Sequence, residues 1–191
     1  MTTRTHHTSD TRSAWPLYSS AYEHDACGVG LVVDIAGRPS RVIVEKALDG
    51  LVNLTHRGAV GADARSGDGS GILIQVPHML FTETLESAGH GDLGPGDYGV
   101  AMLFLPLEDE ALARSRGIVD TAIADRSLET IAWREVPHDP TLLGVTAAQT
   151  LPSIAQVLIR RPEGMDGADF ERELMIARRT IEQGMRSAGF T

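Results

Sequence analysis

Apolar residues recur along most of the chain with two kinds of pattern, and each pattern predicts one kind of secondary structure. Short apolar runs, rich in β-branched residues, predict strands at 28–35, 72–76, 98–105, 128–136 and 154–159. Apolar residues spaced by three and four predict helices from 40 to about 58, at 78–87, at 108–125 and from 166 onward. Strands separated by helices, without the regular alternation of a doubly wound sheet, favour an α/β (α+β) sandwich with helices outside paired sheets.

The first and the last of these helices also carry signals for their ends. Ser40 is a suitable N-cap for the first helix, and a turn at Gly37 precedes it. In the last helix acidic residues come early and arginines come late, which matches the helix dipole. Its apolar stripe consists of Phe170, Leu174, Ala177, Ile181 and Met185.

The segment 58–71 contains five glycines among polar residues, which predicts a loop and not a packed element. Its second half, Gly67-Asp68-Gly69-Ser70-Gly71, has very small side chains. Such a stretch is either a simple turn or the lining of a pocket that presents backbone amides to a ligand.

Size and composition indicate one globular domain. The chain has 191 residues, of which 42% are hydrophobic and 23% charged. Its longest nearly uninterrupted apolar run, 100–105, is far shorter than the roughly 18 residues that a membrane helix needs. Residues 1–26 are polar and have no apolar centre, so they form a leader that is not a secretory signal. A single cysteine permits no internal disulfide, and we expect a cytoplasmic protein.

Charge and motif content exclude several classes of function. A formal net charge of -9, with Lys46 as the only lysine, argues against binding to nucleic acid. The seven histidines are scattered without the spacing of metal ligands, so we predict no metal site. The glycines Gly28 and Gly30 lack the third glycine of a dinucleotide fingerprint and lie within a predicted strand.

Cys27 lies where the polar leader ends and the first apolar run begins, and this position allows two interpretations. A lone cysteine at the start of a strand is most often a small buried apolar residue. Removal of residues 1–26 would instead make Cys27 the N-terminus, with a thiol of pKa about 8.5 beside an amine of pKa about 7.7–8.0. The amine would then be a base next to its own nucleophile.

Arg57 stands in the sequence His56-Arg57-Gly58 at the end of the first predicted helix. In one interpretation the basic residues oppose the helix dipole and Gly58 caps the helix. In the other, the guanidinium of Arg57 holds a substrate carboxylate or orders the nucleophile.

Three blocks of sequence, in this order, resemble the start of the large subunit of bacterial glutamate synthase. They are Asp25-Ala26-Cys27-Gly28-Val29-Gly30, Leu54-Thr55-His56-Arg57-Gly58-Ala59 and Gly67-Asp68-Gly69-Ser70-Gly71-Ile72-Leu73-Ile74-Gln75-Val76-Pro77. The resemblance implies a class II glutamine amidotransferase domain of the N-terminal nucleophile type, with four layers in αββα order. It also implies that 1–26 is a propeptide and that 27–191 is a partial amidotransferase domain.

The same resemblance implies a role for each candidate residue. Cys27 is the catalytic nucleophile that attacks the side-chain amide of glutamine, and Arg57 binds the substrate. Gly67, Asp68 and Gly69 form a possible pocket loop. The ammonia released is passed to 2-oxoglutarate, which makes the complete enzyme an oxidoreductase of ammonia assimilation and glutamate biosynthesis. FMN and a 3Fe-4S cluster belong to the remainder of that large subunit, and NADPH is oxidised by a small partner subunit.

The chain departs from the family pattern in its length. The family uses an Asn-Gly pair from a downstream segment as its oxyanion hole, and Asn53 is the only asparagine here. Since loss of one oxyanion donor lowers the rate roughly 10²- to 10³-fold, we expect the chain alone to be nearly inactive. The alternative is a noncatalytic domain that binds glutamine or a partner subunit.

Overall fold

The computed structural model of the protein describes residues 28–190, except the side chain of Arg57. The chain divides into two compact units, with the boundary between Ala59 and Val60. The described part of the first unit contains the helix α1 (Arg41–Asn53) and the 3₁₀ turn η3 (Thr55–Arg57).

The helix α1 begins as its sequence predicts. The Ser40 hydroxyl accepts a hydrogen bond from the backbone N–H of Val42 at 3.2 Å, which satisfies one of the free donors of the first turn. The predicted stripe is the less exposed face of the helix; it consists of the half-buried residues Ile43, Ala47, Leu51 and Leu54. The helix ends at Asn53, and His56-Arg57-Gly58 lies outside it.

The predicted strands at 28–35 and 72–76 are wrong for this structure. Neither segment is a strand, and Leu31 and Leu73 are 88% and 100% exposed. A strand requires a neighbour that completes its hydrogen-bond ladder, and neither segment pairs with a strand among residues 28–190. The turn after the first segment is confirmed, since Gly37 has a φ of 68° and donates to the carbonyl of Asp34 at 2.9 Å.

The second unit contains an antiparallel sheet of three strands in the order β1-β3-β2. The strands are β1 (Tyr98–Leu105), β2 (Glu129–Glu135) and β3 (Ser153–Arg160), which confirms three of the predicted strands. β1 and β3 pair along their whole length, from Tyr98 opposite Arg160 to Leu105 opposite Ser153. The register of β2 against β3 shifts between Thr130 and Ala132.

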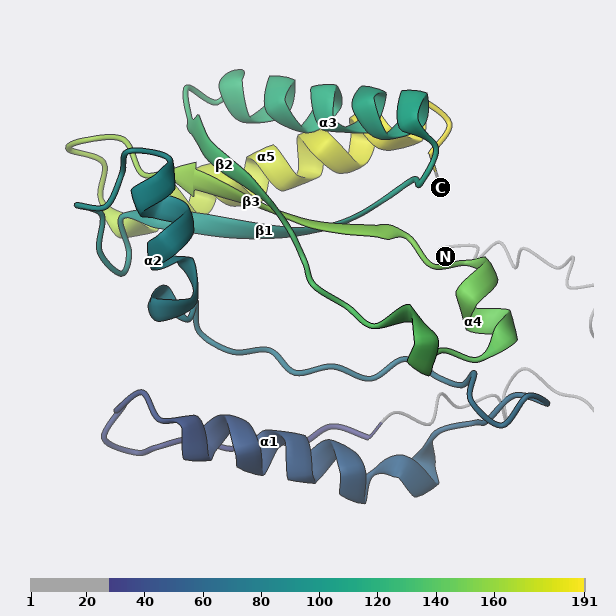
Figure 1. Ribbon diagram of the computed structural model, residues 1–191. Coiled ribbons are helices and arrows are strands. Elements are labelled where there is room, and N and C mark those ends of the chain that lie inside the picture. Colours follow the sequence, from purple (N-terminus) through teal and green to yellow (C-terminus); the bar gives the residue numbers. More distant parts are fainter. Residues whose placement is uncertain (1–27, 191) are drawn as a thin grey trace, which may run out of the picture. The chain divides into compact units, whose positions relative to one another are not determined.

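Three helices of the second unit pack against this sheet, two of them together and one separately (Figure 1). They are α2 (His78–Ser87), α3 (Asp109–Ala124) and α5 (Gly167–Ser187), all close to the predicted bounds. Carboxylates cap two of them: Glu108 accepts from two backbone N–H groups at the start of α3, and Asp166 accepts from the N–H of Asp169 in α5. The short elements η4 (Pro140–Leu142) and α4 (Val145–Gln149) were not predicted.

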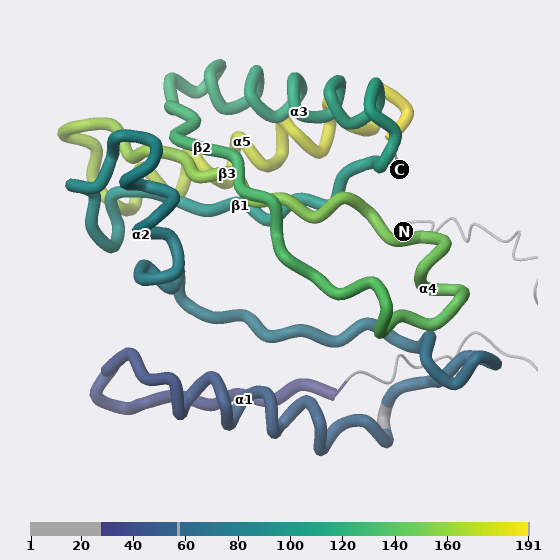
Figure 2. The backbone as a smooth tube through the Cα atoms, in the orientation of Figure 1, coloured from purple at the N-terminus to yellow at the C-terminus, as the bar shows by residue number. Residues whose placement is uncertain are grey.

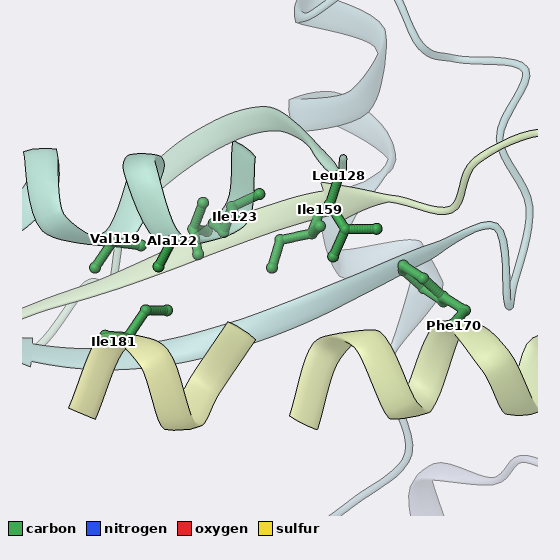
Figure 3. Packing of buried hydrophobic residues seen from close by; sticks show 8 residues of the cluster. Val119, Ala122, Ile123, Leu128, Ile159, Phe170 and Ile181 are labelled. Atoms are coloured by element: carbon green, nitrogen blue, oxygen red, sulfur yellow. The ribbon is translucent and has the colours of Figure 1, made fainter. Parts of the chain in front are cut away.

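The main core lies between the sheet and the pair α3 and α5. Figure 3 shows Val119 and Ile123 of α3 together with Phe170 and Ile181 of α5 around the strand residue Ile159. Successive side chains of a strand point to opposite faces, so Leu158 belongs to a second cluster. That cluster is formed by Phe81, Leu85, Tyr98 and Leu158, which attaches α2 to the sheet.

The mixed α/β class is therefore confirmed. The sheet with α3 and α5 supplies one helix layer and one sheet layer of an αββα sandwich, and residues 28–190 form no second sheet. No helix within these residues combines the length and the apolar composition that crossing a membrane requires.

Candidate functional site

Two of the predicted site residues, Cys27 and Arg57, are not fully described by the structure. Cys27 is outside the described residues, and Arg57 is described by its backbone as the last residue of η3. Their neighbours in the chain are both described. A Cβ atom at position 28 would lie 3.1 Å from Leu54 Cδ2, closer than side chains usually approach. The backbone next to Cys27 therefore packs against the side chain that precedes η3.

The turn that carries Arg57 is held by local hydrogen bonds. The Thr55 hydroxyl donates to the carbonyl of Val52 at 2.6 Å, and His56 Nδ1 lies 2.9 Å from the carbonyl oxygen of Asn53. That carbonyl can only accept, so Nδ1 carries the proton in this bond. Gly58 has a φ of -89°, which is not the left-handed conformation of a helix-capping glycine. The interpretation of Gly58 as the cap of the first helix is therefore wrong.

The loop after this turn is closed on itself at 60–67. Val60 and Gly67 form an isolated antiparallel bridge, and the N–H of Gly61 donates to the carbonyl of Ser66 at 2.6 Å. Inside the loop, the Asp63 carboxylate accepts from the N–H of Ser66 at 2.7 Å and from its hydroxyl at 2.7 Å. These bonds make 60–67 a defined turn, as its glycine and aspartate content predicts.

Asp63 and Ser66 also reach the start of α4, a segment about 80 residues further along the chain (Figure 2). The N–H of Thr146 donates to Asp63 Oδ2 at 3.2 Å, and the N–H of Ala147 donates to Ser66 Oγ at 3.0 Å. The N-cap of α4 is Gly144, which has no side-chain oxygen to satisfy these donors. We call Asp63 and Ser66 the capping pair, since they replace the missing cap.

Gly144 fits the capping pair closely. A Cβ atom at this position would lie 2.4 Å from Ser66 Oγ and 2.5 Å from both Asp63 Oδ2 and the backbone nitrogen of Ser66. Because one of these atoms belongs to the backbone, a change of rotamer would not make room for a side chain. The capping pair therefore requires glycine at this position.

The hydrogen bonds of the capping pair keep Asp63 charged. The bond from the Ser66 hydroxyl, followed by those from the N–H groups of Ser66 and Thr146, holds the pKa of the Asp63 carboxyl well below its usual range. A lowered pKa contributes stability above the unfolded value of about 3.9, and this contribution is lost only as the pH falls through the lower folded value. The cap is therefore in place at neutral pH.

Asp63 and Ser66 lie in the loop predicted at 58–71, and no role was predicted for them. Their spacing of three residues is a signal for a local side-chain turn, because an aspartate often accepts from backbone groups two or three residues later. Their contact with Thr146 and Ala147 had no such signal.

The predicted pocket loop follows the capping pair directly. Gly67, Asp68 and Gly69 are exposed, and a Cβ atom at Gly69 would have no neighbour within 4 Å. Two surface depressions occur elsewhere in the second unit: one of 390 Å³ between α2 and β2, and one of 420 Å³ between α3 and α5. Neither is lined by the loop, so neither is the candidate site.

Metal ligands do not cluster in the part of the chain that the structure describes. Within residues 28–190, no group of three or more His, Cys, Asp or Glu side chains is arranged to hold a metal ion.

Comparison with known proteins finds a family model and relatives that match most of the chain. Residues 27–189 match the family model of glutamine amidotransferases class-II. The chloroplastic ferredoxin-dependent glutamate synthase of Oryza sativa subsp. japonica is 37% identical over 168 residues, which are 88% of this chain and 10% of the relative. The NADPH glutamate synthase large chain of Azospirillum brasilense is 37% identical over 170 residues, 88% of this chain and 11% of the relative.

A third relative, the ferredoxin-dependent glutamate synthase 2 of Synechocystis sp., is 38% identical over 160 residues, 83% of this chain and 10% of the relative. The chain thus spans about a tenth of the length of the curated relatives that it matches.

Proposed function

Because this chain belongs to the class-II glutamine amidotransferases, we propose that Cys27 is the nucleophile that releases ammonia from the side-chain amide of glutamine. The observation that carries this proposal is the start of the family match. The match begins at residue 27, which is the only cysteine of the chain. We further propose that 1–26 is a propeptide and that 27–191 is a partial amidotransferase domain.

The chemistry of an N-terminal cysteine suits this reaction. The α-amine takes the proton of the Cys27 thiol, and the sulfur attacks the amide carbon of glutamine. The resulting tetrahedral intermediate breaks its C–N bond, and the nitrogen leaves as ammonia with the proton that the amine returns. Water then hydrolyses the glutamyl thioester, which yields glutamate and regenerates the thiol.

Arg57 is proposed to bind the carboxylate of glutamine. A guanidinium presents its donors in a planar fork that matches a carboxylate. The packing of Gly28 against Leu54 supports this role, because Gly28 follows Cys27 and Leu54 precedes Arg57 by three residues. We propose that Gly67, Asp68 and Gly69 form a pocket loop that presents its backbone groups to glutamine.

We propose that the complete protein is a glutamate synthase, which passes the ammonia to 2-oxoglutarate. Its relatives are named as glutamate synthases, and this chain corresponds to about a tenth of their length. A 3Fe-4S cluster does not fit this chain, because the chain has a single cysteine and cysteine thiolates hold such clusters. We therefore assign FMN and the 3Fe-4S cluster to the rest of the large subunit.

NADPH, oxidised by a small partner subunit, is our proposal for the electron donor. The Azospirillum relative supports this choice, and the rice relative, at the same identity of 37%, supports ferredoxin as the alternative. Glutamate formation by the purified protein with each reduced donor in turn distinguishes them. We also propose a cytoplasmic location, supported by the leader without an apolar centre and by the lone cysteine.

The experiment that tests the amidotransferase function compares ammonia release from glutamine by the full-length protein and by the 191-residue chain. We expect turnover by the full-length protein. The chain alone is expected to be roughly 10²- to 10³-fold slower, because it contains no Asn-Gly pair to stabilise the oxyanion. Asparagine, which is one methylene shorter, is the control substrate.

A noncatalytic binding domain is the second candidate, and the missing Asn-Gly pair is the observation that favours it. Calorimetric titration of the full-length protein with glutamine separates the two. Saturable binding without ammonia release would establish the binding domain, and turnover would rule it out.

A further inference from the structure

We propose that Asp63 and Ser66, the capping pair, are positioning residues of the glutamine site. They act by holding the start of α4 and the loop Gly67–Asp68–Gly69 in one fixed arrangement. This inference rests on the proposed function, in which that loop lines the glutamine pocket.

The first support is the number of bonds that fix Ser66. Its N–H and its hydroxyl both donate to the Asp63 carboxylate, and its carbonyl accepts from the N–H of Gly61. Its hydroxyl also accepts from the N–H of Ala147. The next residue is Gly67, so the direction in which the pocket loop leaves the turn is set at Ser66.

The loop and the residues after it are rich in glycine. Gly69 and Gly71 have open space where a side chain would lie, and glycine is the residue with the greatest backbone freedom. The conformation of such a segment depends strongly on the residues that anchor its ends. The capping pair is the anchor at the N-terminal end of this loop.

The second support comes from α4, which depends on the same pair. This helix has five residues and no side-chain cap of its own. Thr146 and Ala147 stand at its second and third positions, whose N–H groups have no partner within a helix. A shift of the loop would therefore leave these two donors without their acceptors, so the two segments hold each other.

Asp63→Asn and Gly144→Ala test this proposal in the full-length protein. Asparagine keeps the shape of aspartate but turns one acceptor oxygen into an NH₂ group, which cannot accept from a backbone N–H. Alanine at position 144 would place its Cβ 2.4 Å from Ser66 Oγ and push the pair away from α4.

Two matched controls exist in the same unit. Asp139 caps η4 by accepting from the N–H and the hydroxyl of Thr141, two residues further along, so Asp139→Asn removes a local cap. Gly167 is the first residue of α5, and a Cβ atom there would meet nothing within 4 Å, so Gly167→Ala adds the same methyl group in open space.

Steady-state kinetics with glutamine is the first readout. We expect both test variants to raise KM for glutamine about tenfold, because the loop binds substrate in the ground state as well as in the transition state. We expect kcat to change less than about twofold, since Cys27 is untouched. The two control variants are expected to keep the KM of the unmodified protein.

Hydrogen exchange of the backbone amides of 145–149 is the second readout, and it needs no catalysis. Exchange is expected to be faster in both test variants and unchanged in both controls. Unchanged exchange would show that the capping pair does not hold the start of α4. Faster exchange with an unchanged KM, or a loss of kcat alone, would overturn the positioning role. Ammonia release that survives Cys27→Ala would refute the proposed function instead, so the two failures are distinguishable.

Discussion

Cys27→Ala is expected to reduce glutamine-dependent ammonia release by a factor of roughly 10⁴ or more. This substitution removes the only thiol of the chain and with it the atom that forms the thioester in the proposed function. In enzymes that act through a covalent intermediate, loss of the nucleophile costs about as much as loss of the whole catalytic group. The measurement is the initial rate of ammonia release by the full-length variant at saturating glutamine.

The control for this variant is its affinity for glutamine. The methyl group of alanine fits where the CH₂–SH group was, and Arg57 and the pocket loop are unchanged. We therefore expect calorimetry to give a dissociation constant within about threefold of that of the unmodified protein. A variant that binds glutamine and still releases ammonia at the normal rate would show that another group is the nucleophile.

Leu85→Ala is expected to destabilise the second unit by about 2–5 kcal/mol. The side chain of Leu85 is 0% exposed and packs with Phe81, Tyr98 and Leu158 where α2 meets the sheet. Truncation removes buried apolar surface and leaves a cavity, and both effects lower the free energy of unfolding. Urea unfolding of the chain, followed by far-UV circular dichroism, measures this change.

Leu80→Ala is the matched control, because it makes the same truncation in the same helix. The Leu80 side chain is 52% exposed, so far less apolar surface returns to water. We expect a loss of at most about 1 kcal/mol, since surface substitutions away from special features have small effects. Equal losses for Leu80→Ala and Leu85→Ala would contradict the packing described for α2.

The elements that the sequence predicted well are those whose pattern is local. The helix at 78–87 and the strand at 98–105 have the predicted bounds, and Ser40 is the N-cap of α1 as expected. The strand patterns at 28–35 and 72–76 are equally apolar but form no strand. A strand depends on a partner, and a pattern within one segment does not reveal whether that partner is present.

The same distinction applies to the site. The position of Cys27 after a polar leader is a local signal that fits either a buried apolar residue or a nucleophile, and the resemblance of three sequence blocks predicted the nucleophile. The capping of α4 by Asp63 and Ser66 was not predictable, because it joins residues more than 80 positions apart. α4 itself is too short for a helical period to show in the sequence, and its cap is supplied from outside the segment.

The proposed reaction requires that Cys27, freed as the N-terminal residue, becomes acylated by glutamine. Mass spectrometry of the N-terminal peptide, after the full-length protein is mixed with glutamine and rapidly quenched in acid, tests it most directly. We predict a peptide that begins at Cys27 and carries a glutamyl group on its sulfur. A peptide that begins at Met1, or an unmodified Cys27 in a protein that is releasing ammonia, would contradict the account.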